Sequence, residues 1–266
     1  PLPVQESLPN ARPDAPPPPA MSFAARLLNV FAIPGEVFEV VRANRFCVLN
    51  WLLPALLLAV VGVLTVVVVF SQPSVQKQVR ELGEQQAKAL EQQVKAGKVT
   101  QADADQFQPI IRWWSDPDMR KIVNSMAAVV IGVARVFWWA FILWLVGRMF
   151  LKVQFGYLKT LEVAGLALMI SVLGQIVVLA LTVNPTKIFA APSLALVAPN
   201  FEANRESYLM LGAALVFAFW QISVLSVGLA RLARVPYLRA AWFVFAIWVI
   251  QEPLRLMGDA LGQFRL

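Results

Sequence analysis

The sequence predicts an all-α, polytopic membrane bundle with five transmembrane helices, amphipathic N-terminal helices and an extramembrane helical hairpin between spans 1 and 2. Hydrophobic residues make up 59% of the 266 residues and the mean hydropathy is +0.64, whereas a typical soluble domain is about 45–50% apolar. Charged residues are only 15% of the chain and gather between long uncharged runs. A large soluble core would not need that segregation, so a membrane bundle is predicted.

The first 47 residues precede the first span. Residues 1–20 are rich in proline and predict a disordered tail. In residues 21–47, apolar side chains at helical spacing predict two short helices, the second opened by Pro34 with Glu36 in its first turn. Both are too short to span, so we expect amphipathic helices on the membrane surface; ordinary packing against the bundle is the alternative.

Five apolar stretches predict the spans, since about 20 helical residues cross a hydrocarbon core of ~30 Å. The fifth has an uncharged part of only Ala240 to Gln251, so Arg239 or Glu252 must lie near the core boundary. Small residues on the third and fourth spans, such as Ala164 and Ala167, predict close helix packing. The predicted spans are residues 48–70, 125–147, 161–183, 207–230 and 236–252.

Residues 71–124 form the one sizeable polar insertion. Gln, Glu, Lys and Ala favour a helix from Ser74 to Ala96, and Gly97 is a suitable stop. Thr100, with Asp103 three residues later, predicts the start of a second helix. We therefore expect a helical hairpin outside the bilayer.

Basic residues predict the orientation. With the N-terminus inside, nine Lys and Arg flank the spans on the cytoplasmic side and four flank them on the other side, outside the long insertion. This excess predicts an N-in, C-out topology.

One charged residue lies at the centre of a predicted span. Arg135 costs at least ~2.5–3.5 kcal/mol there on insertion scales, so it needs protein or water partners. Gln175 and Gln221 lie at similar depth, and Glu252 lies within reach of two long side chains. We predict an intramembrane polar cluster of Arg135, Gln175, Gln221 and Glu252, either a static network that fixes helix register or a site for an anion or a proton.

Several function classes lack the residues that they need. The chain has no histidine and a single cysteine, Cys47, which excludes the usual zinc sites and a histidine general base. The predicted spans hold no pair of aspartates, and there is no phosphate-binding Gly-rich loop. We predict no catalytic residue, no metal and no cofactor, and no nucleic-acid partner either, since the basic residues flank apolar segments.

Three sequence segments carry a family resemblance: LNVFAIPGEVFE at 28–39, FGYLKTL at 155–161 and LARVPY at 232–237. With these the chain resembles the bacterial members of the Yip1 family. The resemblance implies five spans, a cytoplasmic N-terminus and a location in a bacterial cytoplasmic (inner) membrane. Eukaryotic members are associated with small GTPases and vesicle traffic, but their acidic, tyrosine-containing N-terminal motif has no counterpart here.

The resulting prediction is a non-enzymatic membrane protein with an organising or scaffolding role. Its expected partners are the lipid bilayer and other membrane proteins or a second copy of itself. The alternative is a small transporter or channel subunit that uses the cluster around Arg135. A dry, closed interior would favour the first function, and a hydrated path to both faces the second.

Overall fold

The computed structural model describes residues 21–183 and 205–264, with the side chains of residues 183, 205–215 and 252–264 left out. Within these ranges the chain forms helices and no strand. The predicted disordered tail, residues 1–20, lies outside the described residues. The helices, in chain order, are α1 (Phe23–Asn29), α2 (Pro34–Ala43), α3 (Leu49–Phe70), α4 (Pro73–Lys95), α5 (Gln101–Trp114), α6 (Pro117–Met149), α7 (Tyr157–Val183), α8 (Arg205–Ala233) and α9 (Tyr237–Phe264).

Four of the described helices are long and apolar enough to cross a membrane. They contribute the segments Leu49–Phe70, Pro117–Met149, Tyr157–Thr182 and Val216–Ala233. Helix α9 offers a shorter apolar segment, Tyr237–Gln251, so the fifth span stays a prediction. With 33 residues, α6 is about 50 Å long and exceeds the thickness of a hydrocarbon core. The chain is a multi-pass membrane protein.

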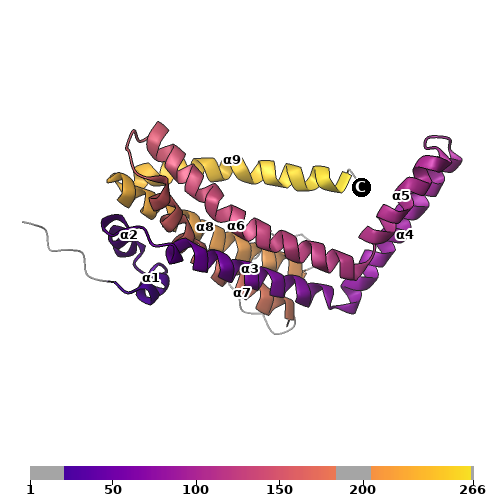
Figure 1. The fold of residues 1–266 in the computed structure, drawn as a ribbon, viewed down its shortest axis with the longest axis horizontal. Helices are drawn as coiled ribbons and strands as arrows, with labels where there is room; N and C mark the ends of the chain where they lie inside the picture. The colour runs from indigo at the N-terminus through magenta and orange to yellow at the C-terminus, as the bar shows by residue number, and fades with distance from the viewer. Residues whose placement is uncertain (1–20, 184–204, 265–266) are drawn as a thin grey trace, which may run out of the picture.

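The long helices lie side by side in one elongated bundle (Figure 1). Helix α7 occupies the centre, with α3, α6 and α8 packed against it, and α9 packs mainly on α8. The core is continuous and apolar along α7, where Val163, Leu166, Leu168 and Ile170 have no exposed surface. The central position of α7 explains why apolar residues lie on every side of its middle part.

Glycine sets the closest approach between α3 and α7. A Cβ atom added to Gly165 would lie 2.2 Å from the Cα atom of Trp51 and 2.7 Å from the carbonyl oxygen of Asn50. The predicted small residues Ala164 and Ala167 beside it are buried. Small side chains let helix backbones approach in membranes, where lipid supplies no hydrophobic driving force between helices.

The two short N-terminal helices lie at one end of the bundle (Figure 1). The Ser22 hydroxyl caps α1 by accepting from the amide of Ala25, and Pro34 starts α2 with Glu36 in its first turn, as the sequence predicts. Helix α2 buries four apolar side chains, and it packs against α8 and α7. Those side chains are Val37, Phe38, Val40 and Val41. Helix α2 is therefore fixed to the bundle, and its position on a membrane surface stays a prediction.

Helices α4 and α5 project together from the opposite end of the bundle, as the α4–α5 arm (Figure 1). Gly97 adopts a φ of +69°, and α5 begins where Thr100 accepts a hydrogen bond from the amide of Asp103 at 3.2 Å. The sequence predicts both the helix end and the helix start. The extramembrane position of the arm stays a prediction.

Candidate functional site

Two of the four predicted cluster residues contact one another. The Arg135 guanidinium on α6 donates from Nη2 to Oε1 of Gln221 on α8, at 3.2 Å. The hydroxyl of Ser171 on α7 donates to the same oxygen. Gln221 is buried, whereas Arg135 keeps an exposed surface. One amide oxygen thus joins three helices near the middle of the bundle.

The other two predicted residues lie apart from this contact. Gln175 donates from Nε2 to the hydroxyl of Thr65 on α3, at 3.2 Å. Its hydrogen bond therefore ties α7 to α3. Glu252 belongs to α9, but its side chain lies outside the described residues.

A second polar network, absent from the sequence prediction, surrounds Glu162 on α7. This side chain is fully buried. Its Oε1 accepts from Nδ2 of Asn50 at 2.6 Å and from the amide of Cys47 at 3.0 Å, and its Oε2 accepts from Nζ of Lys159 at 2.6 Å. Lys159 also donates to the carbonyl oxygens of Val41 and Asn44, both at 2.8 Å. The network fastens the end of α2 and the start of α3 to α7.

The sequence held a signal for this network. Glu162 is an acidic residue inside the predicted third span, and such residues need a partner. Lys159 precedes it by three residues, on the same helix face. The carbonyl groups at the end of α2 carried no signal, because their position depends on the tertiary fold.

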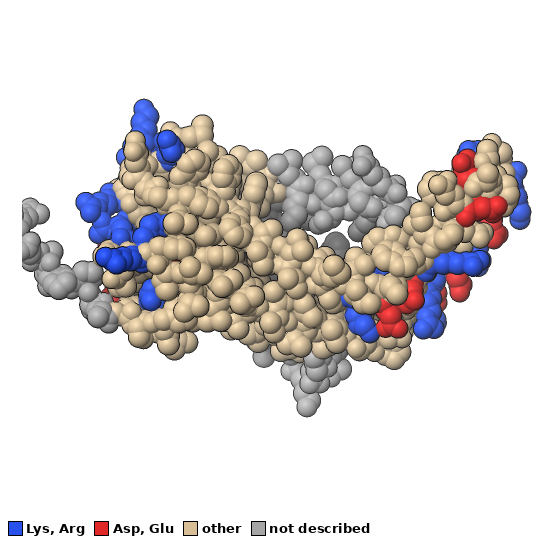
Figure 2. Space-filling view, in the orientation of Figure 1, with Lys and Arg blue, Asp and Glu red and all other residues tan. Residues whose placement is uncertain are grey.

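Basic side chains gather at one end of the bundle. Figure 2 shows Lys and Arg over the end formed by α1, α2 and the α6–α7 and α8–α9 connections, and a mixture of both charges on the α4–α5 arm. We call the first of these the basic end. Its residues are Arg26, Arg42, Arg45, Arg148, Lys152, Lys159, Arg231, Arg234 and Arg239. The surface between the two ends carries little charge in this view, as a lipid-facing belt requires (Figure 2).

The basic end contains a cavity of 560 Å³ between α2, the end of α8 and the start of α9. Glu39, Arg42, Arg231, Arg234 and Tyr237 supply its polar lining. Arg42 donates to Oε2 of Glu39 from Nη2 at 2.6 Å and from Nε at 2.9 Å, and Arg231 donates to Oε1 at 3.5 Å. We call this cavity the arginine pocket.

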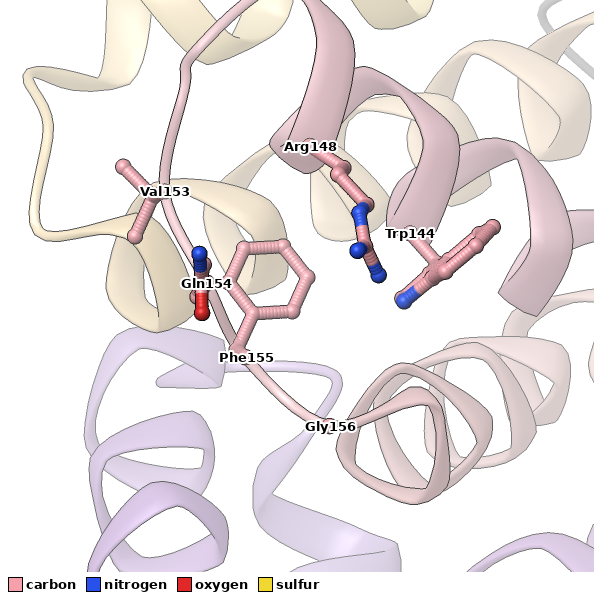
Figure 3. Close-up of a pocket in the computed structure, with 6 residues that line it drawn as sticks. All are labelled: Trp144, Arg148, Val153, Gln154, Phe155 and Gly156. Atoms are coloured by element: carbon pink, nitrogen blue, oxygen red, sulfur yellow. The ribbon is translucent and has the colours of Figure 1, made fainter.

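A smaller cavity of 270 Å³ lies between the end of α6 and the connection to α7 (Figure 3). Its Arg148 guanidinium lies over the ring of Trp144, 5.4 Å from the ring centroid. The ring of Phe155 fills the space over Gly147, where an added Cβ atom would come within 2.1 Å of it. Arg148, the arginine that lines this cavity, is therefore already engaged in a cation–π contact within the protein.

Within the described residues, no three or more His, Cys, Asp or Glu side chains are grouped so that they could hold a metal ion. Among the side chains that the structure describes in the two polar networks, no nucleophile is paired with a base. Their hydrogen bonds join one helix to another.

Comparison with protein families gives one result. A model described as the Yip1 domain matches residues 28–251. The chain belongs to the Yip1 family. No curated protein and no solved structure matches it. The Yip1 match includes the α4–α5 arm, both polar networks and the whole arginine pocket.

Membership of the Yip1 family agrees with the resemblance that begins at Leu28 and runs into the fifth predicted span. The match extends from α1 into α9, so the Yip1 domain includes the four apolar helices and the short apolar segment of α9. Each network described above is therefore part of the Yip1 domain itself.

Proposed function

We propose that this Yip1-family protein organises other proteins in the membrane and has no enzymatic activity. The observation that carries the proposal is an apolar groove on the α4–α5 arm. The groove measures 570 Å³, and Leu82, Leu90, Phe107, Ile110 and Trp114 form its apolar lining. Phe107 and Ile110 are each 50% exposed. Clustered apolar surface on a polar pair of helices is typical of a protein contact site.

The interior of the bundle supports the same proposal. Between Glu162 and Ser171, about 13 Å along α7, the helix presents only apolar side chains, and most of them are fully buried. Facing this layer, the hydroxyl of Ser226 on α8 donates to the Ile222 carbonyl of its own helix at 2.7 Å. An apolar layer of this thickness separates the two polar networks. An apolar layer that interrupts the polar groups along α7 favours a scaffold over a conduit.

Photocrosslinking from the groove tests the proposal. We expect a crosslinking residue at Phe107 to form a protein adduct in the native membrane, and the same residue at the exposed neighbour Gln106 to form none. Phe107→Glu should abolish the complex, whereas Gln106→Glu, which adds the same charge outside the groove, should keep it. A monomer without adducts at either position would contradict the scaffold.

A transporter or channel subunit is the second candidate, and the exposed surface of Arg135 favours it. Reconstituted vesicles separate the two candidates. A transporter predicts solute uptake that Arg135→Leu abolishes. A scaffold predicts that vesicles with the wild type and vesicles with Arg135→Leu take up no more solute than protein-free vesicles.

The membrane orientation belongs to the same proposal. We propose five spans in a bacterial inner membrane, with the basic end cytoplasmic, since Lys and Arg concentrate on the cytoplasmic side of bacterial membrane proteins. Topology reporters near Lys88, near Arg234 and at the C-terminus test this. Opposite locations for Lys88 and Arg234, with the C-terminus on the side of Lys88, are expected.

A further inference from the structure

We propose that the arginine pocket binds the phosphate headgroup of an anionic phospholipid. The inference does not depend on the proposed scaffold function, because it concerns a different surface at the opposite end of the bundle. Three arginines and one glutamate line the pocket, which leaves an excess of two positive charges. Basic pockets between membrane helices are suited to anionic headgroups.

The glutamate arranges the arginines. Arg42 makes two hydrogen bonds to one oxygen of Glu39, so the charge of Arg42 is paired within the protein. Arg231 touches the other oxygen at 3.5 Å and packs over Gly35 of α2, where an added Cβ atom would lie 3.0 Å from Nη2. Arg231 is therefore held in place while most of its N–H donors remain available. A positioned guanidinium suits a phosphate, which it can bind through two parallel hydrogen bonds.

Arg234 carries a positive charge that no described side chain of the protein neutralises. Its side chain forms no ion pair or hydrogen bond with any residue whose side chain the structure describes. Its backbone adopts a φ of +56° after the end of α8, and the amide of Val235 bonds back to the Ala230 carbonyl at 3.1 Å. Glycine favours this conformation and other residues are strained in it. The corresponding position in the α4–α5 arm is indeed a glycine, Gly97.

Helix α9 starts at the pocket and presents an exposed apolar face suited to acyl chains. Tyr237 lines the pocket, and Leu238 and Trp242 follow it on α9, 78% and 75% exposed. The latter two are four residues apart and share one face of the helix. A lipid can therefore place its phosphate among the arginines and its chains along α9, whereas free phosphate would gain nothing from that apolar face.

Lipid retention by the full-length protein tests the assignment. The protein is reconstituted in mixed phosphatidylcholine and phosphatidylglycerol bilayers and extracted in mild detergent, and bound lipid is counted by native mass spectrometry. We expect selective retention of phosphatidylglycerol. Because hydrogen bonds to charged groups are strong, Arg234→Gly should reduce that retention about tenfold.

Lys152 offers a matched control. It lies at the same end of the bundle and also has a positive φ, +55°, but it does not line the arginine pocket. Lys152→Gly removes the same charge and relieves the same strain, so it should retain lipid like the wild type. Both glycine variants should melt at or above the wild-type temperature, which separates lost binding from lost folding. Arg234→Glu and Lys152→Glu form a second pair without the change in backbone freedom, and only the first should lose the lipid.

Three outcomes would overturn the assignment. Equal losses in both members of a pair would mean diffuse attraction to the basic end. Retention of phosphatidylcholine as strong as that of phosphatidylglycerol would mean that no charged headgroup is recognised. Displacement of the lipid by millimolar inorganic phosphate would mean a site for a soluble anion.

Discussion

Lys159 and Glu162 form an ion pair of 2.6 Å on one face of α7, and each bonds to a different part of the chain. Glu162 accepts hydrogen bonds from Cys47 and Asn50 at the start of α3. Lys159 donates to carbonyl groups at the end of α2. The pair thus connects three helices at the basic end, with Glu162 buried and Lys159 partly exposed.

Glu162→Ala is expected to destabilise the protein strongly. It leaves the Asn50 amide without this acceptor and removes the counter-charge of Lys159. Breaking a buried ion pair costs about 3–5 kcal/mol; Lys159 keeps its carbonyl partners, so we expect the lower end. The midpoint of thermal unfolding in detergent should fall by about 6–12 °C.

Two further variants identify the cause of that loss. Glu162→Gln keeps an acceptor for Asn50 and Cys47 and should lose less than the alanine variant. The double replacement Lys159→Met with Glu162→Leu should also be milder than Glu162→Ala, because no charge is left unpaired. If Glu162→Ala melted like the wild type, the network would have no part in holding the helices together.

Gly165→Ala is expected to separate α3 from α7. The new Cβ atom would lie 2.2 Å from the Trp51 Cα atom, and a backbone cannot move aside as a side chain can. Overpacking costs about 1–3 kcal/mol, and we expect a loss at the upper limit. Gly156→Ala is the matched control, since an added Cβ atom there meets nothing within 4 Å. Thermal unfolding of the two variants measures the difference, and similar melting temperatures would exclude a close contact at Gly165.

The sequence predicted the elements of this fold better than their contacts. Uncharged runs located the long helices, and Pro34, Gly97 and Thr100 located helix ends, because those signals are local. The small residues on α7 predicted close packing, but Gly165, where an added Cβ atom would meet the Trp51 backbone, was not among them. Which side of α7 faces α3 depends on the whole bundle, and the helix is apolar all round.

The candidate site shows the same limit. Depth along the helix axis suggested that Arg135 lies near Gln221, and the structure joins the two by a hydrogen bond. Depth in the membrane does not show which neighbour a residue faces. Gln175 lies at a similar depth but faces α3, where it donates to Thr65. In the sequence, Arg234 served only to predict the membrane orientation. Only the folded structure shows that it lies beside Arg231 in a pocket.

The hydrogen bond between Ser171 and Gln221 should be measurable as a coupling energy. Ser171→Ala and Gln221→Leu each remove one partner, and the double variant removes both. Interhelical hydrogen bonds in membranes couple by about 0.6 kcal/mol on average and up to about 1.7 kcal/mol. We expect the upper part of that range, because Gln221 is buried. Additive losses would show that the contact contributes nothing.

Cys47, the single cysteine of the chain, provides a direct test of orientation. It lies at the basic end, beside Arg45 and Asn44 in a cavity of 770 Å³, and its thiol is free and partly exposed. If the basic end is cytoplasmic, a membrane-impermeant maleimide should label Cys47 in inside-out vesicles and leave it unlabelled in right-side-out vesicles. A Cys47→Ser, Lys88→Cys chain should give the reverse, because Lys88 is exposed on the α4–α5 arm and α3 separates the two positions. Labelling of both thiols from one side would mean that α3 does not cross the bilayer, and the reversed pattern would place the arginine pocket on the outer face.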